Sequence, residues 1–408
     1  MCFQKSSKWS SAIETSSLPP IYELTILLLE RLGWSFRRHF CIAQDPQQNQ
    51  ENSLTLPATF KRLKAFRTGT TFEEVAEVVD ERMPEVFPGE VVVKVLYAGV
   101  NGGCETFRAR GDHWFESNRD VGEAGFNLGA EGAGVVVSVG EDVPADISLG
   151  SAVTFVGGAF SEYVKVPARM CYPVPVANPE VVALTISGVV ACAALEVTGQ
   201  MRPGKDVVLV TAAAGGTGHF AVQLAKMAGC HVIATCGGEQ KVEVLKGLGA
   251  DRVIDHTQEC VAEVLHDEYP SGIDLIYEGV GGDMLKAALD NLAEEGRLLL
   301  VGYISEYPHE SASRGRGAPT EAAQWFWKGE SKVRGRQSIY GNVWPKDRQR
   351  ILKSKQKVFD LYAQGKLKAI VDNQESFSSL DDVPRAVKHM LSGTTIGKVV
   401  VHMQSCVK

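Results

Sequence analysis

Residues 206–228 (DVVLVTAAAGGTGHFAVQLAKMA) constrain the fold of this 408-residue chain more than any other segment. The apolar run Val207–Val210 predicts a buried parallel strand, and apolar side chains recur at helical spacing after the glycines. The small residues between them let the backbone come close to a ligand. A helix that starts there presents its first N–H groups and the positive end of its dipole to an anion. Strand, turn and helix together predict a site for the pyrophosphate of a dinucleotide.

The small residues of this turn are the candidates for contact with the pyrophosphate: Ala214, Gly215, Gly216, Thr217 and Gly218. A glycine-rich turn can also serve only to pack a helix closely on a sheet. The downstream sequence favours binding, because strand-like and helix-like patterns alternate there. The predicted strands are residues 231–235, 253–255, 273–277 and 297–301, and the predicted helices are residues 239–248 and 283–292. This alternation predicts an α/β fold with a doubly wound parallel sheet.

The end of the second strand bears on the choice of nucleotide. NAD sites usually place Asp or Glu there, about 20 residues after the glycines, to bind the ribose 2′-OH. This chain has Thr235-Cys236-Gly237-Gly238 instead, and Lys241 follows. A neutral strand end with a nearby cation favours a 2′-phosphate, because a carboxylate would repel it. The sequence therefore favours NADPH as the cofactor, although Lys241 can equally be a solvated helix lysine.

Composition and charge exclude several classes of protein. The chain has 42 Lys and Arg against 49 Asp and Glu, a net charge of −7, so no nucleic-acid partner is expected. Nine cysteines without a C-x-x-C pair argue against a disulfide framework and favour reduced thiols in an intracellular protein. No apolar run is expected to span a membrane. The cytoplasm is the expected compartment, with mitochondria and peroxisomes as open alternatives.

The chain divides into parts that differ in composition and in predicted secondary structure. Residues 1–56 are rich in Ser, Gln and Pro, and they predict an N-terminal extension that is either flexible or a targeting segment. Short β-prone segments with glycine turns follow and predict a small, partly open barrel. These predicted strands are residues 91–96, 131–139, 152–156 and 162–166.

The last part of the chain is predicted to fold back onto the barrel. A sixth strand is expected at residues 332–339, a helix at 349–364 and a closing strand at 398–403. The expected domains are therefore residues 57–178 together with 347–408, and residues 179–346 for the nucleotide.

Four separated segments identify a family resemblance: Gly99-Val100-Asn101, GAEGAGV at residues 129–135, the AAAGGTG turn, and GRLLLVG at residues 296–302. In this order they resemble the medium-chain dehydrogenase/reductase superfamily, over about residues 57–408. Within it the chain looks most like the zinc-free quinone oxidoreductase branch and its prostaglandin reductase-3 group. The resemblance implies a Rossmann domain plus a GroES-like, partly open β-barrel domain.

The resemblance also implies a site without metal. Zinc members of the superfamily have Gly-His-Glu where this chain has Gly129-Ala130-Glu131, and their cysteine ligand aligns with Asn101. An alternative site near Cys104, Glu105 and His113 stays open, although three ligands of fixed geometry would be required.

The activity implied by the resemblance is NADPH-dependent reduction of the carbon–carbon double bond of α,β-unsaturated ketones, such as 15-oxo-prostaglandins or other lipid enones. Hydride would pass from nicotinamide C4 to the β-carbon, a reaction that needs no Lewis acid on the carbonyl. Quinones are the alternative acceptors. A non-catalytic NADP-binding protein is the alternative from another class.

Site roles follow from the same resemblance. Lys241 matches a lysine for the 2′-phosphate, and His256 takes the place of a tyrosine near that phosphate. Gly302 and Tyr303 would border the nicotinamide, with packing as the alternative role for Tyr303. Asn101 matches an asparagine near nicotinamide and substrate, with a turn cap as the alternative. Asn101 and Tyr303 are thus the candidate catalytic residues.

This chain also departs from the family pattern. Members commonly read Thr-Thr-Ala-Tyr where this chain has Val189-Val190-Ala191-Cys192, so we expect cofactor affinity or turnover to differ. Trp325, Phe326 and Trp327 either cover an apolar substrate or serve a core or interface role. Arg314 and Arg316 either meet a carboxylate or are solvated. The family further implies a homodimer formed through the sixth strand.

Overall fold

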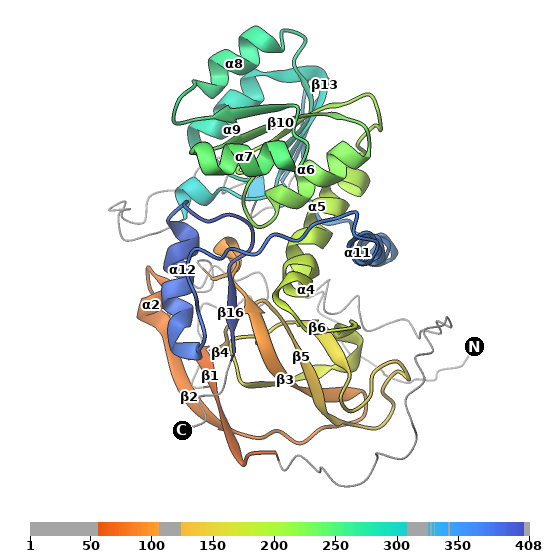
Figure 1. Cartoon of the computed structure of the whole chain (residues 1–408), viewed down its shortest axis with the longest axis vertical. Helices are drawn as coiled ribbons and strands as arrows, with labels where there is room; N and C mark the ends of the chain where they lie inside the picture. The colour runs from red at the N-terminus through yellow and green to blue at the C-terminus, as the bar shows by residue number, and fades with distance from the viewer. Residues whose placement is uncertain are drawn as a thin grey trace, which may run out of the picture.

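The computed structural model describes residues 56–105, 124–307, 325–326, 329, 331–341 and 343–403. They form two parts stacked along the long axis, an upper part around a parallel sheet and a lower part of antiparallel strands (Figure 1). The predictions for the N-terminal extension, His113, Arg314, Arg316 and Trp327 fall outside the described residues.

The upper part contains a sheet with the strand order β11-β10-β9-β12-β13-β15-β14. Its parallel strands are β9 (Val207–Val210), β10 (His231–Cys236), β11 (Arg252–Asp255), β12 (Ile273–Glu278), β13 (Leu292–Leu300) and β15 (Gln337–Tyr340). The helices between them are α6 (Gly218–Met227), α7 (Glu239–Gly247), α8 (Val261–Glu268) and α9 (Gly282–Asp290). The doubly wound parallel sheet is confirmed. Its strand order reverses between β9 and β12, where such sheets bind their ligands.

The predicted sixth strand is in fact a hairpin. β14 (Ser331–Arg334) and β15 pair antiparallel, with Arg334 opposite Gln337. Gly335 makes the tight turn with a φ of 63°, a left-handed conformation that glycine adopts without strain. β14 is the edge of the sheet, and all four of its residues are exposed.

The lower part contains the predicted barrel strands. One sheet has the order β16-β3-β5-β6-β8, with β7 paired to β3. Its strands are β3 (Glu90–Gly99), β5 (Glu131–Val139), β6 (Ala152–Val156), β7 (Tyr163–Pro167), β8 (Tyr172–Pro173) and β16 (Val400–His402). A smaller sheet orders β2 (Ala76–Arg82), β1 (Thr59–Ala65) and β4 (Phe126–Asn127). The short helices α2 (Phe72–Val75) and η1 (Ala168–Met170) complete the first half of this part.

The last part of the chain returns to the lower sheet, as the sequence predicted. After η5 (Leu380–Asp382), helix α12 (Val383–Leu391) packs on the barrel core, and β16 pairs antiparallel with β3. The core of the lower part therefore combines residues from both ends of the chain.

One continuous helical run joins the two parts. It consists of α4 (Pro179–Ala183), a π-helical turn (Leu184–Gly188), α5 (Val189–Cys192) and a second π-helical turn (Ala193–Thr198). Asn178 caps its start by accepting a hydrogen bond from the N–H of Val181. The run Pro179–Thr198 has the length and hydropathy of a membrane span, which the sequence reading had not identified. Because 83% of its most apolar window is buried inside the protein, we interpret it as a core helix.

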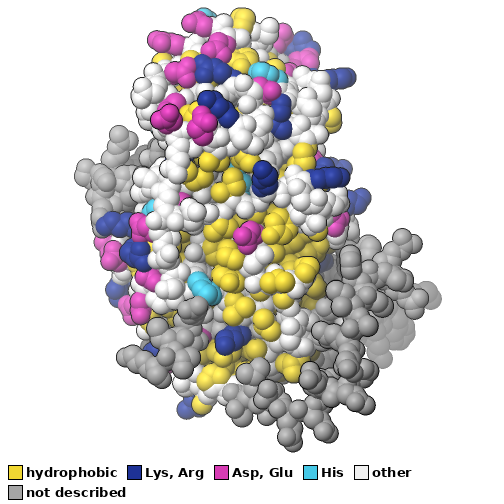
Figure 2. Space-filling view, viewed as in Figure 1, with side chains coloured by type: hydrophobic (Ala, Val, Ile, Leu, Met, Phe, Trp, Pro, Cys, Tyr) yellow, Lys and Arg dark blue, Asp and Glu magenta, His cyan; other side chains and the backbone are white. Residues whose placement is uncertain are grey.

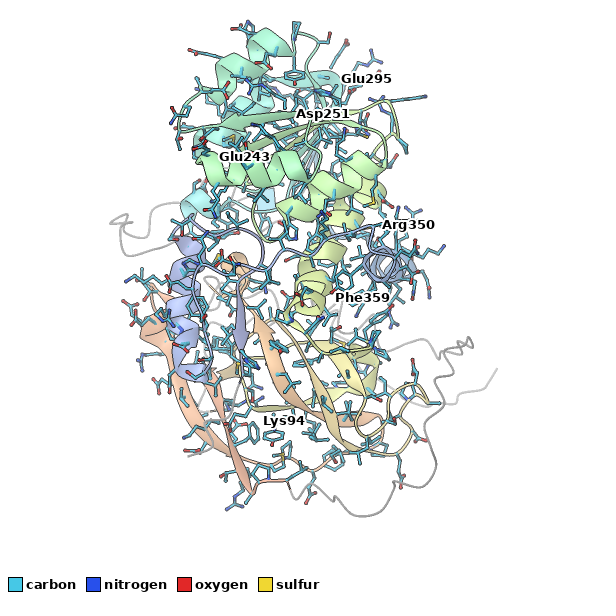
Figure 3. The ribbon with its side chains drawn as sticks, viewed as in Figure 1. Lys94, Glu243, Asp251, Glu295, Arg350 and Phe359 are labelled. Carbon is cyan, nitrogen blue, oxygen red and sulfur yellow. The ribbon has the colours of Figure 1, made fainter. Side chains whose placement is uncertain are left out.

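Helix α11 (Arg348–Ala363) lies across this run (Figure 1). Its Phe359 contacts the ring of Tyr172 on β8, with ring centroids 4.6 Å apart (Figure 3). Residue Glu243, labelled in the same figure, lies on the solvent side of α7 and pairs with Lys246. In the view of Figure 2, basic and acidic side chains are interspersed over the upper part, and hydrophobic side chains gather over the middle of the molecule.

Candidate active site

A cavity of about 250 Å³ opens where the strand order reverses, between the two parts. It brings together the predicted residues Asn101, Gly215, Gly216, Thr217 and Gly302. The other predicted residues do not line it. Ala214 and Gly218 lie in the same turn behind the lining residues, and Lys241, His256 and Tyr303 lie elsewhere.

The glycine-rich turn is shaped for an anion. A Cβ on Gly218 would lie 2.5 Å from the carbonyl oxygen of Ala212, so only glycine fits there. The N–H groups of Thr217 and Gly218 find no acceptor within the described residues, while the N–H of Gly216 faces the carbonyl oxygen of Gly397 in an isolated parallel bridge. They stand at the start of α6, where the helix dipole adds positive potential. This donor set fits the pyrophosphate of a dinucleotide.

A buried hydroxyl on β12 also suits a polar ligand. The side chain of Tyr277 borders the cavity, and its hydroxyl is buried without a hydrogen-bond partner among the residues described. Thr217 lies close enough to affect the pKa of Tyr277, although the two hydroxyls do not meet in hydrogen-bond geometry. Burial raises this pKa, so the tyrosine stays neutral.

Contacts from the C-terminal segment hold the turn in place. The N–H of Gly397 donates to the carbonyl of Ala214 at 2.7 Å. His219 Nδ1 lies 2.9 Å from the carbonyl oxygen of Gly215, and its Nε2 accepts a hydrogen bond from the N–H of Ile370 at 3.1 Å. Burial lowers the pKa of His219 to about 4, so the ring is neutral and its proton is on Nδ1.

A buried charged cluster lies beside the glycine-rich turn, because a Cβ on Gly216 would lie 3.5 Å from Cδ of Lys398 and 3.7 Å from Oγ of Ser187. Lys398 Nζ lies 2.5 Å from Oε1 of Glu131, and these side chains are only 3% and 0% exposed. The same ammonium donates to Oδ1 of Asn101 at 2.7 Å and lies 3.4 Å from Oγ of Ser187. Glu131 also accepts hydrogen bonds from Nδ2 of Asn101 at 2.9 Å and from the N–H of Ile186 at 2.7 Å. This cluster therefore fixes the amide of Asn101 at both ends.

The sequence reading missed Lys398 and Ser187. Lys398 stands alone in the apolar segment IGKVVV that leads into β16, and a lysine at the start of a buried strand is a signal that could have been noticed. Ser187 belongs to no recognisable sequence motif. It lies within a π-helical turn, a rare structure that is frequent at functional sites, but such a turn cannot be recognised from sequence.

The remaining wall of the cavity is mainly apolar. Tyr307, Phe326, Met390 and Trp344 contribute to it. Tyr303 is buried behind this wall, where its ring contacts those of Tyr307 and Phe326 edge-on at 5.0 and 5.4 Å. The geometry thus favours a packing role for Tyr303 and places Tyr307 at the cavity instead. Trp325 is buried in the core, and Phe326 lines the cavity, so the two described residues of the predicted aromatic group differ in role.

The family departure at residues 189–192 also falls at this wall. Val190 lines the cavity with an apolar side chain, while Cys192 is buried, which raises the pKa of its thiol to about 12. The hydroxyl that the helical run does present to the cavity belongs to Ser187.

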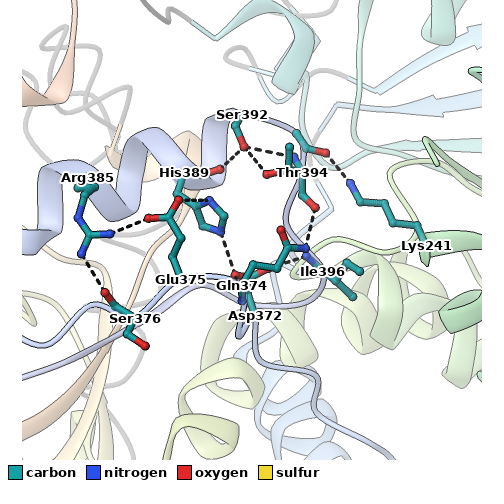
Figure 4. A network of polar contacts seen from close by, with 11 residues as sticks. Lys241, Asp372, Gln374, Glu375, Ser376, Arg385, His389, Ser392, Thr394 and Ile396 are labelled. Atoms are coloured by element: carbon teal, nitrogen blue, oxygen red, sulfur yellow. Dashed lines mark hydrogen bonds and ion pairs between the residues drawn. The ribbon is translucent and has the colours of Figure 1, made fainter. Parts of the chain in front are cut away.

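The predicted 2′-phosphate residues lie at the end of β10, outside the cavity. Lys241 Nζ donates to the carbonyl oxygen of Gly393 at 2.5 Å (Figure 4). Burial lowers the pKa of Lys241. The imidazole of His256 lies against Gly237, less than 3 Å from where a Cβ of that glycine would be. Asp255, the last residue of β11, accepts a hydrogen bond from the N–H of Gly238.

The loop that Lys241 contacts is itself held by a buried pair. His389 Nε2 lies 2.9 Å from Oδ1 of Asp372, whose other oxygen accepts a hydrogen bond from the N–H of Ile396 at 2.8 Å (Figure 4). His389 also lies 3.3 Å from Glu375. These contacts fix residues 392–397, which run directly from Lys241 to Lys398 at the cavity.

The residues described contain no group of three or more His, Cys, Asp or Glu side chains placed to hold a metal ion. Cys104 lines the cavity and Glu105 is buried beside it, while His113 is not described. The carboxylate of Glu131 is engaged by Lys398, as given above.

Comparison with known proteins places this architecture in a family. Residues 87–176 match the model of the alcohol dehydrogenase GroES-like domain, and residues 216–353 match that of the zinc-binding dehydrogenase. The chain is 35% identical to prostaglandin reductase-3 of Mus musculus over 90% of this chain and 94% of that protein. It is 36% identical to a probable quinone oxidoreductase of Leishmania amazonensis over 86% of this chain and 100% of that protein.

Solved structures agree with these sequence matches. A mycobacterial protein solved in complex with NADPH superposes with a TM-score of 0.67 at 26% identity, covering 84% of this chain and 99% of that one. A quinone oxidoreductase of Pseudomonas syringae gives the same TM-score, identity and coverage.

Proposed function

Because the chain belongs to the medium-chain dehydrogenase/reductase superfamily of oxidoreductases, we propose that it is an NADPH-dependent reductase of the carbon–carbon double bond of α,β-unsaturated ketones. One observation carries the proposal. The cavity combines unpaired main-chain N–H groups at the start of α6, a cation beside them (Lys398, the one charged side chain among the described lining residues) and a mainly apolar wall. The N–H groups suit a dinucleotide, and the apolar wall suits an apolar ketone.

The cofactor would be held by residues whose hydrogen-bond donors have no partner among the described residues. The N–H groups of Thr217 and Gly218 would bind the pyrophosphate, and Tyr277 offers a further hydroxyl. Lys241 and His256 would meet the 2′-phosphate at the end of β10, with Gly302 beside the nicotinamide. When bound, NADPH supplies the hydride for the β-carbon. The protein aligns the two reactants and excludes water.

A bulky, lipid-like enone is the acceptor that the cavity supports best. Its wall of Tyr307, Phe326, Met390 and Trp344 suits an apolar chain rather than a small polar carbonyl compound. The printed name of the mouse relative, prostaglandin reductase-3, supports the same class.

A quinone is the second candidate acceptor, supported by the names of the Leishmania and Pseudomonas relatives. A non-catalytic NADP-binding role is the remaining alternative, supported by the apolar Val190 in the wall. The full-length chain is mixed with NADPH and matched panels of enones and quinones, and loss of the cofactor's absorbance is followed. Faster turnover of enones supports the proposal, and faster turnover of quinones supports the second candidate. Tight NADPH binding without any turnover supports the third.

We also propose that the chain forms a homodimer through β14. This strand is an exposed edge with free backbone groups, and its Val333 is 76% exposed. Sedimentation of the full-length chain tests this proposal, and a monomer at all concentrations contradicts it. We propose the cytoplasm as the compartment.

A further inference from the structure

We propose that Lys398 and Ser187 together stabilise the negative charge that develops on the carbonyl oxygen of the acceptor. This inference rests on the proposed function and names the electrophilic side of the same cavity. It identifies a charge-stabilising residue pair that neither the glycine motif nor the candidate residues Asn101 and Tyr303 supply.

Lys398 is the first part of the argument. Among the described residues that line the cavity, it is the one with a charged side chain. Its ammonium makes short contacts with Glu131 and Asn101, at 2.5 and 2.7 Å, and a long contact with Ser187, at 3.4 Å. The third N–H is therefore the weakly engaged one, and it lies on the side of Ser187.

Ser187 is the second part. An ammonium has no acceptor, so the serine oxygen must accept in this contact and its own hydrogen must point elsewhere. No acceptor for that hydrogen lies within hydrogen-bond distance among the residues described, although the residue is 1% exposed and lines the cavity. A buried donor without a partner is costly, and an oxygen of a bound molecule would satisfy it.

Asn101 acts through these groups rather than on the substrate. Its Nδ2 donates to Glu131 and lies 3.5 Å from the carbonyl oxygen of Gly99, and its Oδ1 accepts from Lys398. The amide thus has no free donor to offer the acceptor. We assign Asn101 and Glu131 as positioning residues that aim the ammonium at the cavity.

Lys398 and Ser187 act when negative charge forms on the carbonyl oxygen of the acceptor. The β-carbon of the enone gains a hydride from NADPH, which becomes NADP⁺, and the double bond shifts toward the carbonyl carbon. The electron pair of the C=O bond moves onto oxygen, where the Ser187 O–H and the Lys398 N–H meet it. The α-carbon then takes one proton from water, which restores the carbonyl and gives the saturated ketone. Fixed donors at a developing oxyanion are among the largest catalytic effects.

The test compares Ser187→Ala with Thr185→Val. Thr185 lies in the same π-helical turn, but its hydroxyl donates to the carbonyl of Val181 and does not line the cavity, so it is the matched control. The rate of NADPH oxidation in a single turnover is measured with a saturating enone, together with the Kd for NADPH and the Tm. We expect Ser187→Ala to slow the single turnover about 10- to 100-fold, in line with the loss of one oxyanion donor, with little change in Kd. Thr185→Val should keep the wild-type rate.

A second variant removes the charge of Lys398 without leaving an unpaired buried carboxylate, so that the protein stays folded. Glu131→Gln combined with Lys398→Met removes both charges at once, and it should slow the same step more than Ser187→Ala does while the protein remains folded. An unchanged single-turnover rate in either variant overturns the inference. So does a raised Kd for NADPH with an unchanged rate, which would assign the pair to the cofactor. A wild-type chain that reduces no acceptor overturns the proposed function itself, and the inference with it.

Discussion

Lys398 Nζ lies 2.5 Å from Oε1 of Glu131, and the two residues come from the last and the first thirds of the chain. Glu131 begins β5 and Lys398 precedes β16, so their contact links the two strands that flank β3 at the cavity. Glu131 also binds the N–H of Ile186 in the π-helical turn. One carboxylate therefore joins the barrel, the connecting helical run and the C-terminal segment.

The stability of the protein should depend strongly on keeping this pair matched. Lys398→Met leaves a buried carboxylate without its partner, and we expect it to lower the free energy of unfolding by about 3–5 kcal/mol. Adding Glu131→Gln should recover most of that loss. Urea denaturation of the single and double variants measures the coupling. The same double-mutant cycle on the exposed pair Lys61 and Asp80 should give a coupling free energy of less than about 1 kcal/mol. Equal coupling free energies in the two pairs would contradict the prediction.

His219 should make the protein acid-sensitive. Burial holds its pKa at about 4, below the ordinary value of 6.5, so protonation favours the unfolded state. The neutral ring contributes to the free energy of unfolding fully above pH 6.5, and this contribution is lost as the pH falls through 4. The loss in free energy of unfolding is at most about 3 kcal/mol. We expect the Tm of His219→Gln to fall less steeply than that of the wild type over this range.

The exposed His256 provides the control for that measurement. His256→Gln should keep the wild-type pH dependence of the Tm. If His219→Gln and His256→Gln follow the same curve, another group causes the acid sensitivity.

Lys241 should discriminate between the two nicotinamide cofactors. Lys241→Ala removes the cation that we assign to the 2′-phosphate, and we expect the Kd for NADPH to rise about 10- to 100-fold, a loss of about 1.4–2.8 kcal/mol. The Kd for NADH should stay nearly unchanged. Fluorescence titration measures both. Lys246→Ala, on the same helix but paired with the exposed Glu243, should change neither, and a loss of NADH affinity in Lys241→Ala would indicate a general defect.

Two glycines offer opposite predictions for the same substitution. Gly218→Ala would place a Cβ 2.5 Å from the Ala212 carbonyl oxygen, so we expect a loss of about 1–3 kcal/mol in unfolding free energy and weaker cofactor binding. Gly247→Ala, at the end of α7, meets nothing within 4 Å and should stabilise the protein by about 0.5–1 kcal/mol. Thermal unfolding and NADPH titration check both, and a stable, tightly binding Gly218→Ala would contradict the packing argument.

Local patterns predicted the parts of the fold that depend on neighbours in sequence. The strands around residues 207–210 and 273–277 and the glycine turn follow from apolar runs and small residues, and the structure has them. The hairpin at Gly335 was missed, because a turn inside a β-prone segment depends on one backbone conformation rather than on hydropathy.

The site was predicted less completely, for a physical reason. The glycine turn is local, so its residues could be identified from the motif. The cluster of Lys398, Glu131 and Ser187 is assembled from three distant segments, and nothing in each segment alone indicates the others. The position of Tyr303 after the fifth strand left a cavity role and a packing role open, and its ring lies behind Tyr307.

The contact between Gly397 and Ala214 has a consequence for how the enzyme is made. The nucleotide fold is translated well before its last binding partner, so a nascent or truncated chain that stops near residue 370 would possess the glycine motif without the segment that braces it. Such a fragment would lack Lys398 as well. A premature stop near residue 370 should therefore remove the brace of the glycine turn and the cation of the cavity together.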